Sequence, residues 1–219
     1  MTLQDILYKT PFQPHELINF LKYSLSLKDT YEQKIRHYTL EKHTLLVMNE
    51  FEKYFFQIDL PIKRATFRLL LALHDIGKPQ AMKQGNIKHQ HQYTPVIIQE
   101  LNHKLPIEAA ENNIIINLVN NDILGLYMQN KITCDKAKNE IINLVSKTNL
   151  SIVAFFKLMT LYYQCDVGSY TADAGGLRYL EYLFEYQNNI KFLDVVEERL
   201  RFSRLLETKF ITLKKLLQL

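Results

Sequence analysis

The 219-residue sequence has no tryptophan, only six glycines and only six prolines. Glycine and proline punctuate a chain with turns, so a turn-dense β architecture is not expected. Long stretches rich in Leu, Ile, Lys and Glu fill the space between these breakers, and such residues favour helices. No series of alternating strand-like runs joined by hairpin turns is found. The expected fold class is all-α.

Cysteine is nearly absent as well: Cys134 and Cys165 stand far apart, and no CxxC pair occurs. A disulfide framework or a thiolate zinc site is therefore not expected, and a reducing compartment fits. Residues 1–20 lack the basic and apolar regions of a signal peptide. No apolar run reaches the ~18 residues that span a bilayer. We expect a cytoplasmic protein with no membrane partner.

The excess of positive charge is small. Lys and Arg number 27 against 23 Asp and Glu, which gives a net charge of +4. This surplus is compatible with an anionic substrate but is too weak and dispersed to predict nucleic-acid binding by itself. The most basic stretch, 191–219, is interpreted as a solvated helix face. The sequence leaves the oligomeric state open.

Apolar residues recur at helical spacing along most of the chain. The expected organisation is an N-terminal helical extension (1–30), a helical bundle domain (31–175) and C-terminal helices packed on the same domain (176–219). Thr133 and Ser151 are expected to be N-caps. The pattern predicts helices over 15–27, 31–58, 61–75, 91–104, 107–121, 134–147, 152–167 and 193–219, with a polar loop over 80–90 and a break at 174–176.

Three places in this pattern carry metal-binding side chains. His43 lies on the apolar stripe of the helix predicted over 31–58, the pair His74-Asp75 closes the next helix, and Asp166 ends a strongly apolar one. An ionised carboxylate at the end of an apolar run is costly unless it is paired or binds a cation. Imidazole with carboxylate suits Mn, Fe, Ni, Co or Zn. Each signal alone is weak, because a histidine on an apolar stripe is usually a hydrogen-bonded core residue.

The ordered set resembles the HD superfamily of metal-dependent phosphohydrolases, whose pattern is His, then His-Asp, then a distant Asp. The matching segments are EKHTLLV with His43, LLLALHDIGKP with His74 and Asp75, and LYYQCDVGSY with Asp166. The likeness covers residues 36–170 and is greatest to the HD module of bacterial tRNA nucleotidyltransferases. Nothing resembles the catalytic domain of those enzymes. The resemblance implies an HD-type helical bundle that binds a divalent ion, Mg included.

The resemblance leaves the number of ions open. HD enzymes with two ions usually carry two further histidines, and His91 in KHQHQYTPVIIQEL matches the first, in preference to His89. Where the second is expected, this chain has Asp122. That carboxylate either helps to bind a second ion or caps a helix, in which case one ion binds. His37 is off the helical face of His43 and is interpreted as a surface residue or one that lies behind the ligands.

The resemblance also implies a basic residue for the substrate. Lys78, in the turn after the His-Asp pair, is expected to contact the substrate phosphate, with Asp75 and His91 as the other catalytic candidates. Arg36, Lys88 and Arg178 are weaker candidates for phosphate contact.

Hydrolysis of a nucleotide or a related phosphoester, either a phosphomonoester or a cyclic or linear phosphodiester, is the expected function. An RNA-end phosphatase or cyclic phosphodiesterase is a variant of it. The alternative is a non-catalytic HD module that binds a nucleotide, RNA or a protein partner.

Overall fold

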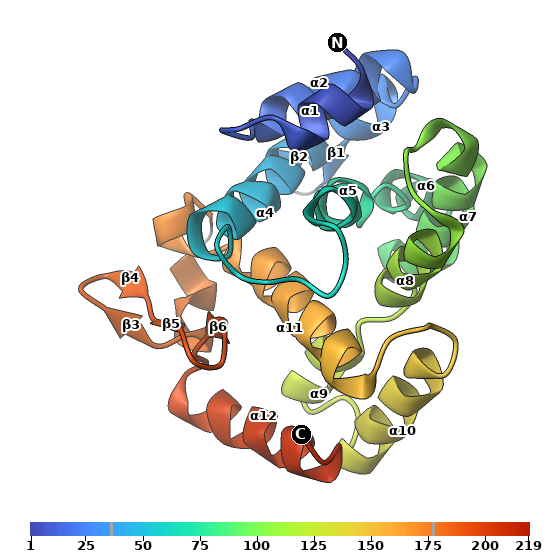
Figure 1. Cartoon of the computed structure of the whole chain (residues 1–219). Helices are drawn as coiled ribbons and strands as arrows, with labels where there is room; N and C mark the ends of the chain where they lie inside the picture. The colour runs from blue at the N-terminus through green and yellow to red at the C-terminus, as the bar shows by residue number, and fades with distance from the viewer. Residues whose placement is uncertain (36, 177) are drawn as a thin grey trace. The chain divides into compact units, whose positions relative to one another are not determined.

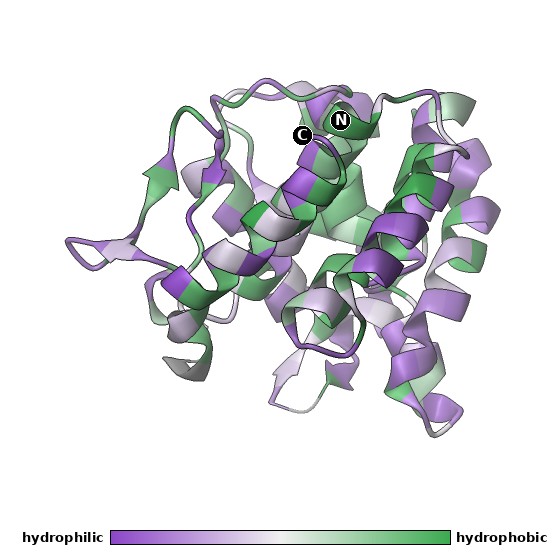
Figure 2. Ribbon diagram, turned by 90° about the horizontal axis from the view of Figure 1, so that it is seen from below, coloured by the Kyte–Doolittle hydropathy of each residue, from purple (hydrophilic) through white to green (hydrophobic). Residues whose placement is uncertain are grey.

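The computed structural model describes residues 1–35, 37–176 and 178–219, without the side chains of residues 178, 179 and 181. Helices make up most of these residues, and the strands form antiparallel pairs of two residues each (Figure 1). The all-α fold class is confirmed. Many helices carry hydrophobic residues along one side and hydrophilic residues along the other (Figure 2), as amphipathic helices do. No helix among the described residues has both the length and the apolarity needed to cross a bilayer.

The chain forms two compact units, each made of two segments: residues 1–48 with 62–121, and residues 49–61 with 122–219. Helix α4 (Leu40–Tyr54) contributes its first part to the first unit and its last part to the second. The domain boundaries expected at residues 30 and 175 stay predictions.

The first unit contains the histidines of interest. Its core includes Tyr31, whose hydroxyl donates a hydrogen bond to the carbonyl of Ala72 at 2.8 Å. Its other elements are α1 (Leu3–Tyr8), α2 (Pro14–Ser24), α3 (Lys28–Glu32), β1 (Lys34–Ile35), β2 (Tyr38–Thr39), α5 (Arg64–Leu73), α6 (Lys78–Lys83), α7 (Gln90–Leu101) and α8 (Ala109–Val119), with short 3-10 turns at Ile87–His89 and Asn102–Lys104.

In the second unit, helix α11 is the central apolar element. Gln164 is buried on it and holds β6 in place, because its amide donates to the carbonyl of Leu200 at 2.6 Å and accepts from the Leu200 N–H at 2.8 Å. The unit contains α9 (Ile123–Met128), α10 (Cys134–Val145), α11 (Ile152–Gly168), 3-10 turns at Ala172–Ala174 and Arg178–Leu183, β3 (Tyr186–Gln187), β4 (Ile190–Lys191), β5 (Leu193–Asp194), β6 (Arg199–Leu200) and α12 (Arg204–Leu216).

The expected N-caps are confirmed: the Thr133 and Ser151 hydroxyls accept from Lys136 N–H and Ala154 N–H. The helix predicted over 31–58 is wrong at its start, because the pair β1 and β2 interrupts it and α4 begins at Leu40. Thr39 gives the local reason, since its hydroxyl accepts from the Lys42 N–H at 3.2 Å in the manner of an N-cap.

Three further boundaries differ from expectation. Helix α5 begins at Arg64 rather than at Pro61. The polar loop predicted over 80–90 is wrong in its first part, because Pro79 lies in the first turn of α6, where proline is favoured, rather than ending a helix. The helix predicted from 193 begins only at Arg204. The strands β5 and β6 precede it, joined by a turn in which Asp194 accepts from two backbone N–H groups.

Candidate metal centre

The His-Asp pair lies where one buried helix ends and a short one begins. Helix α5 is buried almost all round, and His74 is its C-cap. Asp75 follows in a tight turn that ends at α6, and its carbonyl accepts from the Lys78 N–H at 2.9 Å. The apolar run before the pair therefore brings both side chains into the core, where His74 and Asp75 are each 2% exposed.

Three side-chain nitrogen atoms contact one carboxylate oxygen of Asp75. Asp75 Oδ2 lies 3.1 Å from His43 Nε2 and 3.2 Å from His74 Nε2, and it also contacts the ammonium of Lys78. The two imidazole Nε2 atoms are 3.3 Å apart. His43 reaches this point from α4, where it is 1% exposed. The structure thus brings together His43, His74 and Asp75, which the sequence predicted as ligands of one ion, and adds a contact of Lys78 with Asp75.

Backbone contacts fix the orientation of His74. Its Nδ1 lies 2.7 Å from the carbonyl oxygen of Leu71, and a carbonyl only accepts, so Nδ1 carries the proton. Without an ion, a protonated His74 donates from Nε2 to Asp75, and after loss of that proton the ring has its lone pair on Nε2, facing Asp75. A hydrogen bond of this kind from the far ring nitrogen is the usual support of a metal-ligating histidine.

Asp75 is held ionised despite its burial. Burial by itself would raise the pKa of Asp75, but the charges of His74 and Lys78 and hydrogen bonds from both histidines outweigh it. The pKa of this carboxyl is therefore well below its ordinary value. A carboxylate that stays ionised over the ordinary pH range is suited to bind a cation.

The donor atoms have the spacing of ligands on one ion. Ions held by imidazole and carboxylate at ~2.0–2.2 Å keep neighbouring donor atoms about 3.0–3.5 Å apart. The separations of 3.1, 3.2 and 3.3 Å among His43 Nε2, His74 Nε2 and Asp75 Oδ2 match this spacing. If both histidines are neutral with their protons on Nδ1, the two Nε2 lone pairs and Asp75 Oδ2 face one another, an arrangement that a bound cation stabilises. These residues fit a divalent metal ion.

His91 and Asp122 are not among the groups of three or more metal-ligating side chains that the described residues bring together. His91 Nδ1 donates to the carbonyl of Val119 at 2.8 Å, so its Nε2 has the lone pair. Asp122 is the N-cap of α9, and its Oδ1 accepts from the Gly125 N–H at 3.1 Å. The sequence left two roles open for Asp122, a metal ligand or a helix cap, and in the structure its side chain caps α9.

The remaining candidates are placed as follows. Asp166 is on α11 of the second unit, and its assignment as a ligand stays a prediction. His89 is exposed and hydrogen-bonded to Asn86 at 3.0 Å, and His37 and Lys88 are exposed. Arg36 and the side chain of Arg178 lie outside the described residues.

Sequence reasoning missed two supporting residues. Tyr38 stacks on the His43 ring, with centroids 5.6 Å apart and an interplanar angle of 26°. Thr94 is fully buried on α7, and its hydroxyl accepts from the Gly77 N–H at 3.1 Å, which ties the turn after the His-Asp pair to that helix. If Thr39 had been recognised as an N-cap, the predicted helix would have started at residue 40. Tyr38 would then have stood just before that helix, close in sequence to His43. No local signal points to Thr94.

Comparison of the chain with protein-family models, with curated proteins and with solved structures finds no match.

Proposed function

We propose that this protein is a metal-dependent phosphohydrolase of the HD type. The observation that carries the proposal is the meeting of His43, His74 and Lys78 on one buried oxygen of Asp75. Its support is twofold: the donor set and its spacing fit a divalent ion, and the same residues carry the resemblance to the HD superfamily. A small phosphorylated compound, such as a nucleotide, is the proposed substrate.

His43, His74 and Asp75 would hold the ion, with Asp166 as the proposed fourth ligand from the order of the HD pattern. A divalent ion in such a site lowers the pKa of a coordinated water toward neutrality and offsets charge on a phosphoryl group. The Leu71 carbonyl keeps the His74 ring in the tautomer that this role needs. Burial of the three side chains excludes bulk water and strengthens their hold on a cation.

The proposed role of Lys78 is to bind the substrate rather than the ion. Its side chain is 15% exposed, while that of Asp75 is 3% exposed, so the ammonium lies between the buried ligands and solvent. A cation bound to Asp75 would free the Lys78 ammonium from that carboxylate, and Lys78 would then contact a phosphate oxygen of the substrate. A charge-assisted hydrogen bond of this kind is worth roughly 1.5–3 kcal/mol.

One ion is proposed rather than two. The side chain of Asp122 is engaged as the cap of α9, and His91 donates to a backbone carbonyl. His91 is only partly buried and is proposed to contact the substrate.

The test is a metal and activity survey of the purified chain. The protein is stripped with chelator, reloaded separately with Mn, Fe, Ni, Co, Zn or Mg, and assayed on phosphomonoesters, phosphodiesters and nucleotides. We expect one bound ion per chain and phosphate release with at least one ion. His74→Gln and Asp75→Asn should lose both the ion and at least about 100-fold in kcat/KM.

The matched control is His103→Gln, because His103 is an exposed histidine remote in sequence from the candidate ligands. Circular dichroism of each variant establishes that it is folded. Equal phosphate release by the wild type and by folded His74→Gln would overturn the proposal. Tight nucleotide binding without release would favour the non-catalytic HD module instead.

A further inference from the structure

The His43 ring has an aromatic neighbour to which the proposed chemistry gives no role. The Tyr38 ring is stacked on the His43 ring, with centroids 5.6 Å apart and planes inclined by 26°. The His74 ring meets the same imidazole at an inclination of 58°, which is a different kind of approach. Tyr38 is partly buried, while His43 is 1% exposed. One face of this candidate ligand is therefore covered by an aromatic ring.

The backbone around Tyr38 holds its ring in this place. Tyr38 lies in the β1–β2 pair, and the next residue, Thr39, caps α4 through its hydroxyl. The Leu40 N–H donates to the Gln33 carbonyl at 3.0 Å, so the hairpin is tied to the first residue of the helix. Tyr38 and His43 thus belong to one short, hydrogen-bonded segment that brings the two rings together.

The stacked face of His43 and its donor atom point in different directions. Nε2 lies in the plane of the imidazole and is 3.1 Å from Asp75 Oδ2, while Tyr38 covers the face of the ring. An ion on Nε2 would be bound at the ring edge, where Tyr38 does not block it. Stacking restricts rotation of the imidazole, as the Leu71 carbonyl does for His74.

The charge of the ring face adds a second effect. Coordination through Nε2 would leave the imidazole of His43 partly positive, because its lone pair would be shared with a cation. The face of an aromatic ring is negative, so it attracts a positive group placed over it, whereas two neutral rings gain less from a face-to-face arrangement. The Tyr38 ring would therefore stabilise His43 with an ion more than His43 without one, and this difference contributes to metal affinity.

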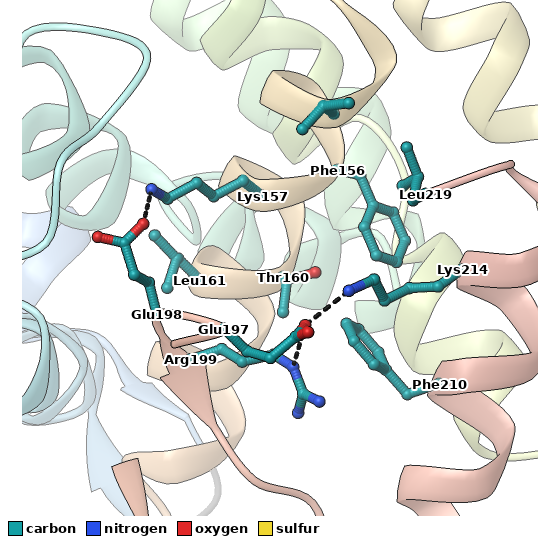
Figure 3. Close-up of a pocket in the computed structure, with 11 residues that line it drawn as sticks. Phe156, Lys157, Thr160, Leu161, Glu197, Glu198, Arg199, Phe210, Lys214 and Leu219 are labelled. Atoms are coloured by element: carbon teal, nitrogen blue, oxygen red, sulfur yellow. Dashed lines mark hydrogen bonds and ion pairs between the residues drawn. The ribbon is translucent and has the colours of Figure 1, made fainter. Parts of the chain in front are cut away.

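Positive groups lie over aromatic faces elsewhere in this chain. The Arg199 guanidinium lies 4.4 Å from the centre of the Phe210 ring, and both side chains line a cavity of the second unit (Figure 3). In the first unit, the Arg68 guanidinium lies 3.9 Å from the centre of the Phe12 ring. The 5.6 Å separation of the stacked rings at the candidate metal centre is within the ~6 Å over which such attraction acts.

We propose that Tyr38 is a positioning residue of the candidate metal centre, whose ring face orients His43 and raises the affinity of the site for a divalent ion. The stacked geometry, its support by the hairpin and the in-plane position of Nε2 carry this proposal. It rests on the metal-binding part of the proposed function and is independent of the substrate and of the hydrolysis.

The experiment titrates the chelator-treated full chain with Co, whose visible absorption reports its ligands and their geometry. Three substitutions separate the contributions of the side chain. Tyr38→Phe keeps the aromatic face, Tyr38→Leu keeps an apolar side chain without that face, and Tyr38→Ala removes both. Tyr23→Leu, at a tyrosine of α2 that is 65% exposed, is the matched control. Urea unfolding of the metal-free proteins measures stability separately from metal affinity.

We expect Tyr38→Phe and Tyr23→Leu to bind Co with the affinity and the absorption spectrum of the wild type. Tyr38→Leu should bind Co roughly 2- to 10-fold more weakly, even where its metal-free stability equals that of Tyr38→Phe. Tyr38→Ala should bind at least as weakly as Tyr38→Leu. A purely structural role would lower the stability of the metal-free chain and leave the Co affinity of the folded protein unchanged.

Equal Co affinity of the wild type and folded Tyr38→Leu would overturn this role of Tyr38 and leave the metal centre in place. A loss of affinity in Tyr38→Phe equal to that in Tyr38→Leu would also overturn it, because the aromatic face would not be the cause. If the wild type binds no ion, the proposed function fails together with the role of Tyr38. A protein that binds Co in the expected order of affinities but releases no phosphate would contradict the hydrolysis alone.

Discussion

Asp75 is the residue on which the candidate metal centre depends. Its carboxylate is buried, and burial opposes ionisation, yet His74 and Lys78 keep its pKa well below the ordinary value. The protein thus maintains a negative charge in its interior with cationic and hydrogen-bonding neighbours that a metal ion can replace. Lys78 is the neighbour closest to solvent, so under the proposed function it would compete with the ion for Asp75 and exchange that carboxylate for the substrate phosphate.

Lys78→Met should separate these two roles. We expect kcat/KM for phosphorylated substrates to fall roughly 10- to 100-fold, because a charge-assisted hydrogen bond to phosphate is lost. The bound ion should be kept, and its affinity should rise, since Asp75 no longer shares its oxygen with an ammonium. Metal analysis and steady-state kinetics measure the two effects. Lys83→Met, exposed at the end of the same helix, is the control and should leave both unchanged.

Gly77 allows α7 to approach the turn after Asp75. A Cβ atom at this position would lie 2.5 Å from the Thr94 nitrogen and 2.7 Å from the Gln90 oxygen, both of which are backbone atoms that cannot rotate away. Gly77→Ala should therefore lower the unfolding free energy by roughly 1–3 kcal/mol. Urea unfolding measures this. Thr94→Ser keeps the hydroxyl that accepts from Gly77 and should cost less, and a neutral Gly77→Ala would show that the turn has room.

The parts of the site that sequence reasoning predicted are local or follow from helical spacing. His74, Asp75 and Lys78 belong to one short segment, and His43 was identified from its apolar stripe. Thr94 reaches Gly77 across 17 residues, and no local pattern marks that contact. Motif and periodicity thus predict which side chains meet at the candidate metal centre, and they do not predict the residues that support those side chains.

At the scale of elements, a buried ion pair joins the end of α4 to β4. The Lys191 ammonium contacts Glu50, donates to the Gly168 carbonyl at 3.1 Å and lies 3.1 Å from Asp173 Oδ1, and its side chain is fully buried. Lys191 and Glu50 are 141 residues apart in sequence.

Lys191→Met should be strongly destabilising. It leaves the Glu50 carboxyl buried without its cation, and breaking a buried pair in this way costs about 3–5 kcal/mol. The double variant Glu50→Gln/Lys191→Met should be more stable than Lys191→Met alone, since the fully buried Glu50 carboxylate is no longer left without its cation. Urea unfolding of the three proteins tests this. Equal stability of the single and double variants would mean that the unpaired Glu50 carboxylate is not the cause of the destabilisation in Lys191→Met.

The same pair predicts a pH dependence. Burial raises the pKa of Glu50 from 4.5 to about 7, although Lys191 opposes the shift. The folded chain then holds this proton more tightly than the unfolded chain, so the contribution of Glu50 to stability is fully present below pH 4.5 and is lost as the pH rises through 7. Relative to Glu50→Gln, the wild type should lose on the order of 2–3 kcal/mol of unfolding free energy between pH 4.5 and 8. If the unfolding free energy of the wild type, measured relative to that of Glu50→Gln, stays constant or rises with pH, the raised pKa of Glu50 is contradicted.

Periodicity predicted the long helices better than the short strands. Two-residue strands such as β5 and β6 are too short to establish an alternating pattern, and the apolar residues between 193 and 203 resemble the start of α12. Asp194, which closes their turn through two backbone N–H groups, is the one local sign of a hairpin.

At the scale of the whole molecule, a metal ion should stabilise the folded chain. Three proposed ligands come from α4 and the end of α5, which are brought together only by folding, so the ion binds the unfolded chain weakly. At 100 times its Kd the ion adds about 2.7 kcal/mol, which raises the thermal midpoint of a chain of this size by roughly 5–10 °C. Calorimetry of chelator-treated protein with and without Mn, Ni or Co measures the shift. His74→Gln should abolish it, His103→Gln should retain it, and Asp166→Asn should reduce it if Asp166 is the fourth ligand. An equal shift in the wild type and His74→Gln would place the ion elsewhere in the chain.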